Sequence, residues 1–450
     1  MRQLIPARQW WASIAAIALV APAQAQNRDA EIATAPLSYA RSWTGFYVGG
    51  AVGLAALNNR TINSAGGAVT TLDGAGGTGV LASVYGGVDY QVIPKAVIGA
   101  LLEGSYSSTQ SSATAQLPGA GASIATQPNW GFSALVRAGI LASPDTLLYF
   151  VGGYSGQNFH SFGSANVGSL SASFSRDDWF NGFTVGSGLE ARLRGAWTTK
   201  LEYRYTQFES RNIAGSGLSF SPNLHAVRAG LTYRFGEPGQ SAQDAPADEA
   251  PHDWTGIYIG AAGGVSATVT RLNAAIGSAN TGMIGSGQSV LGGAFGGYDW
   301  QWGDSAVIGF LGELEWMGAQ STASLNTSSS GFSVTSRTNM AWSALGRIGF
   351  LPTRSTMIYA VGGYTGQFVS TWGNATLGGT GPSFQRDDYF NGWTAGPGIE
   401  TVIFGGWTTR LEYRYSQFEE RTVVAGATVQ PASHTIRAGL SYKFGPAAGK

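Results

Sequence analysis

The chain has 450 residues, a formal net charge of zero and no cysteine. The lack of cysteine excludes disulfides, zinc–thiolate sites, thiol nucleophiles and a lipoprotein anchor, and the neutral charge argues against nucleic-acid binding. Charged residues make up only 12% of the chain, glycine occurs 67 times, and no stretch after residue 25 resembles a membrane-spanning helix. This composition favours a membrane β-barrel, because only helices and closed barrels satisfy their backbone in lipid.

The first 25 residues predict a cleaved secretory signal. Arg2 and Arg8 supply positive charge, and residues 10–21 form an apolar segment that is too short to span a bilayer. Ala23-Gln24-Ala25 then matches the small-x-small cleavage pattern. An uncleaved N-terminal anchor is the competing interpretation. We expect a periplasmic tail at 26–42 after the signal.

The rest of the chain repeats itself at a period near 210 residues. LEYRY at 201–205 returns unchanged at 411–415, and WTGFY at 43–47 returns as WTGIY at 254–258. A period this long is a whole domain and not a solenoid unit. We therefore predict a first barrel at 43–235, a polar, proline-bearing periplasmic linker at 236–253, a second barrel at 254–444 and a C-terminal tail at 445–450.

Each repeat divides into eight segments with alternating apolar and polar residues. Short connections at 93–95, 143–146 and 194–196 contain turn residues, whereas 56–78, 109–128, 160–176 and 210–222 are rich in Gly, Ser, Ala and Thr and are predicted as loops. Short turns at one end and long loops at the other are typical of an outer-membrane barrel. The eight predicted strands of the first repeat are 43–55, 79–92, 96–108, 129–142, 147–159, 177–193, 197–209 and 223–235.

The alternation predicts which side of each strand meets lipid. In the last strand of the first repeat, Val227, Leu231 and Tyr233 share one face, and Arg228 and Thr232 share the other. A soluble ligand-carrier barrel also alternates, but its outside needs more charge than these polar faces carry. Five aromatic residues near predicted strand ends are expected to form interfacial girdles: Trp43, Trp130, Tyr149, Trp179 and Trp197.

The strand ends resemble a known family. WTGFYVGG at 43–50 is similar to the opening strand of the alphaproteobacterial porin-family or OmpA-like surface barrels, which are distant relatives of opacity adhesins. RAGLTYRF at 228–235 and RAGLSYKF at 437–444 resemble the closing-strand signal read by the outer-membrane assembly machinery. The residues that carry this signal are Gly230, Tyr233, Phe235, Gly439, Tyr442 and Phe444. Six residues follow Phe444, whereas the family usually ends on that aromatic residue.

The resemblance implies an all-β protein made of two transmembrane, antiparallel, up-and-down, eight-stranded barrels in tandem in the Gram-negative outer membrane, with periplasmic termini. A single sixteen-stranded barrel is the alternative. An 18-residue connection between strands eight and nine, where other turns have three or four residues, argues against it. So does the presence of a closing-strand signature in each repeat.

Charged residues on the polar faces predict a network inside each barrel. An eight-stranded barrel is just wide enough for side chains to fill it, and buried charges must be paired, so we favour a salt-bridged plug over an ion-selective pore. The expected residues of the first repeat are Asp89, Glu103, Arg137, Glu190, Arg192, Lys200, Glu202, Arg204, Arg228 and Arg234; those of the second are Asp299, Glu313, Arg347, Glu400, Arg410, Glu412, Arg414, Arg437 and Lys443.

Other motifs give weaker signals. Adjacent carboxylates in Arg176-Asp177-Asp178 and in the equivalent residues 386–388 could hold a divalent cation, but solvated loop charge is favoured. His225 and His434 occupy equivalent outer strand ends without a serine and carboxylate at triad-like spacing. We therefore expect an interfacial role for both histidines, no enzyme activity, no metal and no cofactor.

The function predicted from the sequence is structural and surface display, with long extracellular loops that serve adhesion or another surface interaction. Passive diffusion through a porin-type channel is the alternative, and a lipid hydrolase is the weakest hypothesis. The expected partners are outer-membrane lipid, lipopolysaccharide, the outer-membrane assembly machinery and an unidentified extracellular ligand, with no nucleic acid.

Overall fold

The structure, a computed structural model, describes residues 42–65, 68–213, 218–235, 252–276, 279–326, 330–377, 381, 383–424 and 427–444. The predicted signal and C-terminal tail lie outside the described residues, as do residues 26–41 and 236–251. Every regular element in the described part is a β-strand. Among these residues no helix has the length and apolar character needed to cross a membrane.

The first repeat closes into a barrel of eight long strands. In wall order they are β1 (Gly45–Ala65), β2 (Ala68–Ile93), β3 (Ala96–Ser107), β5 (Ala120–Ser143), β6 (Thr146–Val167), β7 (Leu170–Arg192), β8 (Trp197–Phe208) and β10 (Leu218–Phe235). The ring closes where β10 pairs with β1 in antiparallel register, with Phe46 opposite Phe235. Two short strands, β4 (Gln110–Leu117) and β9 (Arg211–Ile213), extend the wall at one end.

The second repeat forms a second ring of the same order. Its wall contains β11 (Gly256–Ile276), β12 (Ala279–Trp302), β13 (Ala306–Asn326), β14 (Ser330–Thr353), β15 (Thr356–Leu377), β16 (Ser383–Phe404), β17 (Trp407–Phe418) and β19 (Ala427–Phe444), with β18 (Arg421–Val424) at its edge. β19 pairs with β11, and Ile257 lies opposite Phe444. Each repeat closes on itself, so the single sixteen-stranded barrel is wrong.

The two faces of each strand follow the predicted alternation. Phe46, Val136 and Leu231 are exposed on the outside, with 69%, 67% and 46% of their surfaces accessible. Arg137 and Arg228, on the opposite faces of β5 and β10, are buried. The period of two in the sequence therefore separates an apolar outer wall from a polar interior, as expected for strands of a closed barrel.

The strands are longer than the sequence predicted. Most residues of the predicted loops at 56–78, 109–128 and 160–176 lie in strands, and the β6–β7 hairpin continues until Val167 faces Leu170. The Gly, Ser, Ala and Thr residues of these segments are typical of loops, but pairing with the neighbouring strands determines their conformation here. The long ends therefore form β-ribbons that extend beyond the ring, which we call the ribbon end; the opposite end, with tight turns such as 144–145, is the turn end.

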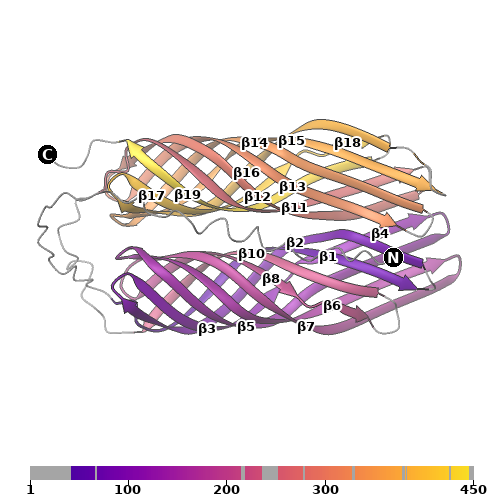
Figure 1. The fold of residues 1–450 in the computed structure, drawn as a ribbon, viewed down its shortest axis with the longest axis horizontal. Coiled ribbons are helices and arrows are strands. Elements are labelled where there is room, and N and C mark those ends of the chain that lie inside the picture. Colours follow the sequence, from indigo (N-terminus) through magenta and orange to yellow (C-terminus); the bar gives the residue numbers. More distant parts are fainter. Residues whose placement is uncertain are drawn as a thin grey trace, which may run out of the picture.

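The two barrels lie side by side with nearly parallel axes (Figure 1). They meet along a surface that we call the seam, formed by equivalent strands of both repeats. Its buried apolar members from the first barrel are Leu189, Ala191, Leu201 and Val227, and those from the second are Ile399, Leu411, Tyr413 and Ile436. Val227 lies on a predicted lipid-facing side, but the second barrel covers it.

The ribbon ends of the two barrels join into one sheet. β4 pairs with β12, with Gln116 opposite Asn280, and β2 pairs with β13, with Leu72 opposite Leu325. Between these pairings Ala75 lies opposite Gly285, its counterpart one repeat later. Contacts between equivalent positions indicate an approximate two-fold axis between the barrels, as in an isologous dimer interface.

Candidate functional site

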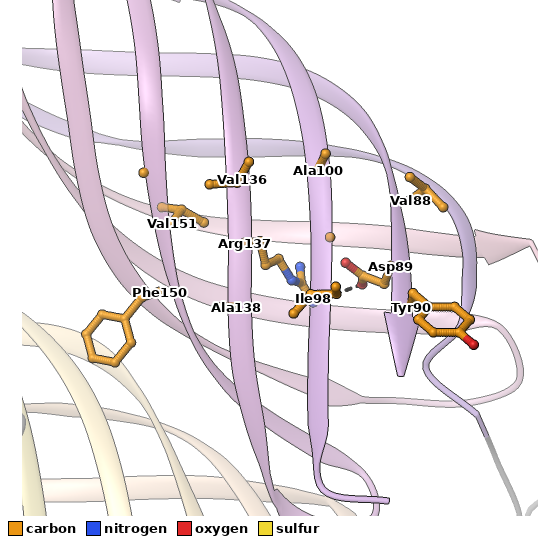
Figure 2. Close-up of a pocket in the computed structure, with 12 residues that line it drawn as sticks. Val88, Asp89, Tyr90, Ile98, Ala100, Val136, Arg137, Ala138, Phe150 and Val151 are labelled. Carbon is orange, nitrogen blue, oxygen red and sulfur yellow. Dashed lines mark ion pairs between the residues drawn. The ribbon is translucent and has the colours of Figure 1, made fainter. Parts of the chain in front are cut away.

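The interior of the first barrel contains a closed ring of ion pairs near its turn end. Arg137 contacts Asp89 at 3.2 Å and Glu190 at 2.8 Å. Arg234 contacts the same two carboxylates at 2.6 and 3.1 Å. Thr198 adds a hydrogen bond to Glu190 at 2.6 Å. Two acids and two arginines thus neutralise each other inside the barrel; Figure 2 shows the Asp89–Arg137 pair.

A second ring of ion pairs, which we call the upper ring, lies on the ribbon-end side of the first. Arg228 bridges Glu103 at 2.6 Å and Glu202 at 3.2 Å, and Arg204 bridges the same pair at 3.1 and 2.7 Å. The ammonium of Lys200 lies 3.9 Å from the Glu202 carboxylate. All five side chains are buried, so both carboxylates are held by more than one cation, which offsets part of their desolvation cost.

Aromatic rings link and support these charges. The Tyr149 hydroxyl donates to Glu202 at 2.8 Å, and its ring lies 4.4 Å from the Arg137 guanidinium. The Lys200 ammonium lies 3.6 Å from the centre of the Tyr85 ring. Such cation–π contacts are strongest where water is excluded. The charged residues of this network were predicted from the sequence, but the contacts of these tyrosines with them were not.

The second barrel repeats both rings with changes. Arg347 pairs with Asp299 at 3.5 Å and with Glu400, while Lys443 takes the place of Arg234 and contacts Asp299 at 3.1 Å. Tyr359 again links the rings, because its hydroxyl donates to a carboxylate of the upper ring at 2.8 Å.

The upper ring of the second barrel contains one acid more than predicted. Arg414 contacts Glu313 at 2.7 Å and Glu412 at 2.5 Å, and Arg437 contacts Glu313. Glu315, which the sequence analysis missed, contacts Arg437 at 2.5 Å. Alternation alone would have found Glu315, because it lies two residues after Glu313. Arg410 completes this ring at 4.0 Å from both Glu313 and Glu412. The predicted network residues of each repeat thus come together, except Arg192.

Arg192 belongs to a floor at the turn end. Its guanidinium lies 4.6 Å from the Trp43 ring and donates to the Ser42 carbonyl at 2.9 Å. Trp43 is completely buried, and its indole N–H donates to the Pro144 carbonyl at 3.2 Å. The prediction that Trp43 and Tyr149 are girdle residues is therefore wrong, because both are fully buried and point into the barrel. Trp130 and Trp197 do lie exposed on the outer wall.

An apolar cap fills the ribbon end of the first barrel. Phe159 contacts Phe180 and Phe208 edge-on, with ring centres 4.9 and 5.1 Å apart, and Phe220 follows at 6.2 Å from Phe180. The same cluster includes the aliphatic residues Ala55, Leu57, Leu81, Leu224 and Ala226. In the second barrel the cap contains Phe390, Phe418 and Val369, so valine stands in place of Phe159. Phe159, Phe180 and Phe208 lie within predicted strands, but the sequence did not show that their rings meet, because they come from three different strands.

Hydroxyl groups lie between the cap and the charges. Ser133, Ser155, Thr184 and Thr206 form an unbroken chain of hydrogen bonds of 2.6–2.7 Å across four neighbouring strands. From turn end to ribbon end, the first barrel therefore contains an aromatic floor, two ion-pair rings, a hydroxyl belt and an apolar cap. Chemically, this arrangement holds the wall together from within.

The charged motif of the β6–β7 ribbon makes local contacts. Arg176 pairs with Asp178 at 2.9 Å, and Asp177 pairs with His160 at 3.0 Å. Ser175 Oγ lies 3.5 Å from His160 Nε2, which gives the connectivity of a Ser-His-Asp triad that the sequence analysis did not detect. The Asp177 side chain is 62% exposed. Water therefore solvates the carboxylate that would have to orient the histidine. The three residues lie on a solvated ribbon and not in a shielded active site.

Two further carboxylates lie where β8 and β17 end. Glu209 accepts the backbone N–H of Asn181 at 3.1 Å, and this hydrogen bond holds the pKa of Glu209 below its usual value. Glu419 and Asn391 repeat the arrangement. Within the described residues, no group of three or more His, Asp or Glu side chains is arranged to hold a metal ion.

Comparison with known proteins identifies the family. The model of the outer membrane protein beta-barrel domain matches residues 12–235 and again residues 240–444. The chain belongs to this family. It is 30% identical over 160 residues to the 31 kDa outer-membrane immunogenic protein of Brucella melitensis, a match that covers 34% of this chain and 66% of that protein, just under two thirds of its length.

The chain is also similar to other proteins. The chain is 30% identical over 204 residues to the 22 kDa outer membrane protein of Rhizobium leguminosarum, covering 45% of this chain and 82% of that protein. A solved structure, Neisserial surface protein A, matches at 16% identity with a TM-score of 0.22, covering 42% of this chain and 98% of that chain. The protein is an outer-membrane β-barrel protein of the Gram-negative type.

The closing-strand residues have a visible packing role in this outer-membrane protein. A Cβ at Gly230 would lie 3.0 Å from both Lys200 and Tyr85, so glycine leaves room for the cation–π pair. Tyr233 and Phe235 lie on the outer wall with ring centres 5.1 Å apart. Tyr442 and Phe444 form the same pair at 5.0 Å, and Gly439 lies against Arg410.

The outer wall of the first barrel also has a hollow of about 700 Å³ over β2, β3, β5 and β6 (Figure 2). Ala100, Ala138 and Gly152 form part of its lining. In the second repeat, Phe310 and Ile348 replace the two alanines, and both project from the wall.

Proposed function

We propose that this outer-membrane protein has a structural and surface-display role, in which two closed barrels anchor one joined β-ribbon surface outside the cell. The observation that carries the proposal is the filled interior. Each barrel contains two layers of ion pairs across its interior, and a buried charge that loses its partner costs several kcal/mol.

The size of the barrels supports closure. The interior of an eight-stranded ring is just wide enough for side chains, and here arginines occupy its middle. Arg347, Arg410 and Arg414 of the second barrel are among the largest fully buried side chains of the described residues, and Arg137 of the first barrel is 3% exposed. A diffusion pore needs a wider or emptier interior than these residues leave.

The orientation follows from the two unlike ends. Short turns face the periplasm in barrels of this class, and long connections face outward. We infer that the turn end, the linker and both termini are periplasmic, and that the ribbon end is extracellular. The joined ribbons from β2, β4, β12 and β13 would then be the surface that meets an extracellular ligand.

The predicted partners fit the same orientation. Lipid and lipopolysaccharide would contact the apolar wall, including Val52 and Val84. The outer-membrane assembly machinery would read the closing strands that end at Phe235 and Phe444. Both predictions remain part of the proposal.

The purified full chain in planar bilayers tests closure. We expect no stable conductance steps at either polarity, with a general porin in the same bilayers as the positive control. The matched variant Arg137→Ala combined with Glu202→Ala should produce brief, small openings. Large, stable steps from the unchanged protein would overturn the proposal.

Epitope insertion in cells tests display. A tag inserted in the β6–β7 connection at Gly168 should bind antibody on intact cells. The same tag in the β5–β6 turn at 144–145 should bind only after the outer membrane is opened. The reverse pattern would overturn the proposed orientation.

A further inference from the structure

The outer walls of the two barrels differ on the strands that lie opposite the seam. In the wall order of the first barrel, β3 and β5 are four places from β8 and β10, which carry the seam residues Leu201 and Val227. The hollow of about 700 Å³ lies over β3, β5 and their neighbours, and all its lining residues come from the first barrel (Figure 2). The hollow therefore faces away from the second barrel of the same chain.

Large and small residues are exchanged between the two barrels in this region. Six pairs of equivalent, outward-facing positions on β3, β5 and β6 combine a large side chain in one barrel with a small residue in the other, and each barrel carries the large member of three pairs. The pairs are Leu102 with Gly312, Val136 with Gly346, Phe150 with Ala360, Ala100 with Phe310, Gly104 with Leu314, and Ala138 with Ile348. The strand register confirms the equivalence, because Ala100 lies opposite Val136 just as Phe310 lies opposite Gly346.

Other outward positions carry the same residue in both barrels. Ile98 corresponds to Ile308 on the same strands, Tyr154 corresponds to Tyr364, and Leu231 corresponds to Leu440. Contact with lipid alone thus permits the same side chain at equivalent positions of the two walls. The paired exchange of sizes indicates instead that these two surfaces fit each other.

The approximate two-fold axis brings equivalent positions to the same height. Ala75 lies opposite Gly285 at the ribbon end, and His225 and His434 line one small cavity elsewhere in the seam. The axis therefore runs along the length of the two barrels, which lie side by side (Figure 1). A second copy placed alongside in the same orientation can thus set its hollow against Phe310 of the first copy at the same depth in the membrane.

In lipid, the fit of side chains decides whether two apolar walls associate. Lipid tails solvate such a wall as well as another barrel does, so association depends on van der Waals packing and on small residues that allow close approach. Phe310 and Ile348 are each 64% exposed in one copy. Against a neighbour, these two side chains would pack on its Ala100 and Ala138, while its Leu102 would pack over Gly312.

We propose that this protein binds a second copy of itself, with Phe310 and Ile348 of one molecule in the hollow of the next. The contact joins two different surfaces, so it recurs at the free side of each added copy and builds an open row in the membrane. A lipid molecule is the competing occupant of the hollow, but it does not account for the exchanged sizes on the second barrel. The proposal is independent of the display function, since it concerns the lipid-facing walls.

Crosslinking in intact outer membranes tests the row. The chain has no cysteine, so Ile98→Cys with Ile308→Cys places one thiol beside the hollow and one beside the protruding Phe310. A short bis-maleimide should convert this variant into a ladder of dimers, trimers and larger species. Leu231→Cys with Leu440→Cys, on β10 and β19, is the matched control and should remain monomeric. A ladder that is missing from the first variant, or equally strong in the control, would overturn the proposal.

Exchange of the two sizes separates specific packing from chance proximity. In the Ile98→Cys, Ile308→Cys background, Ala100→Phe fills the hollow and Phe310→Ala removes the protruding ring, so each change should abolish the ladder. The two changes together reverse which barrel carries the large side chain, so the ladder should return. Heat-modifiable gel mobility should stay unchanged in all three variants, because both positions lie on the outer wall. A ladder that survives Ala100→Phe, or that does not return in the combined variant, would overturn the proposal and leave lipid as the occupant.

Discussion

Thr146 and Thr356 occupy equivalent positions one repeat apart, and their hydroxyls hydrogen-bond to each other at 2.8 Å. Thr356 also contacts Thr401 at 3.1 Å. All three side chains are fully buried, although each lies on the outside of its own barrel. A contact between a residue and its own counterpart places Thr146 and Thr356 on the approximate two-fold axis of the seam.

This contact predicts a specific crosslink. The chain contains no cysteine, so Thr146→Cys with Thr356→Cys should form one disulfide under mild oxidation. After cleavage at a protease site placed in the linker, the two halves should migrate together on a non-reducing gel and separate on reduction. Thr146→Cys with Thr408→Cys is the control, because Thr408 points into the second barrel and bonds Glu400. Halves that separate in the test pair would show that the seam does not form.

Labels on the outer wall should report the seam as well. Leu231 and Val227 share the outer face of β10, but Leu231 is 46% exposed and Val227 is 8% exposed. In vesicles that contain brominated lipid, a fluorophore at Leu231→Cys should be strongly quenched, and one at Val227→Cys should be quenched much less. Equal quenching would mean that lipid separates the barrels, and no quenching at Leu231 would reverse the assignment of inside and outside.

Removal of one carboxylate should destabilise the first barrel. In Glu202→Ala, Arg204 and Arg228 lose a shared partner, and breaking a buried ion pair in this way costs about 3–5 kcal/mol. The urea midpoint in lipid vesicles should fall accordingly. Glu209→Ala, at the exposed residue that follows the same strand, should change stability by less than ~0.5 kcal/mol. Similar effects of both variants would contradict the structural role of the ring.

The two apolar caps should contribute unequally. Phe159→Ala removes a ring that packs against two other rings, so the free energy of unfolding should fall by about 3–5 kcal/mol. Val369→Ala, at the equivalent position, removes two methyl groups and should cost about 2 kcal/mol, at about 0.8 kcal/mol per buried methylene plus a small cavity. Urea unfolding in lipid vesicles measures both variants. Equal losses would mean that the first cap is not packed as described.

The serine of the β6–β7 ribbon should be catalytically silent. Ser175→Ala should leave the acyl chains of lipid A unchanged in cells that overproduce the protein, as judged by mass spectrometry. The unchanged protein is the comparison, and cells without it provide the baseline. Deacylation that appears with the unchanged protein and vanishes in Ser175→Ala would make the Ser175–His160–Asp177 group an active site.

Local sequence patterns predicted the wall and most of the charges. The alternation of Arg228 with Leu231 and Tyr233 depends on neighbours along one strand, so it could be read without the fold. Glu103 and Glu202 come from different strands, yet both were expected inside because each lies on a polar face. The ion-pair partners of these two residues could not be predicted, because they depend on the stagger between neighbouring strands, which the sequence of one strand does not show.

Long-range features could not be read in the same way. Leu201 and Leu231 both lie on an apolar outer face, but one meets the second barrel and the other meets the surroundings. Nothing near either residue separates the two cases, because the difference depends on how two complete barrels pack. The cap around Phe159 could not be predicted for the same reason, because its partners Phe180 and Phe208 lie on two other strands. The small residues after Phe159 are typical of a loop, although their partners on β5 and β7 keep them in a strand.

The approximate two-fold seam has a consequence for how such a protein can diverge. When two identical subunits pair, any substitution appears on both sides of the axis at once, so the new side chain must be compatible with its own copy across the axis. Here both halves are encoded separately, so Ala191 could change without its counterpart Thr401, and Ala100 without Phe310. Tandem duplication thus fixes a one-to-one ratio of the halves while it lets each specialise alone.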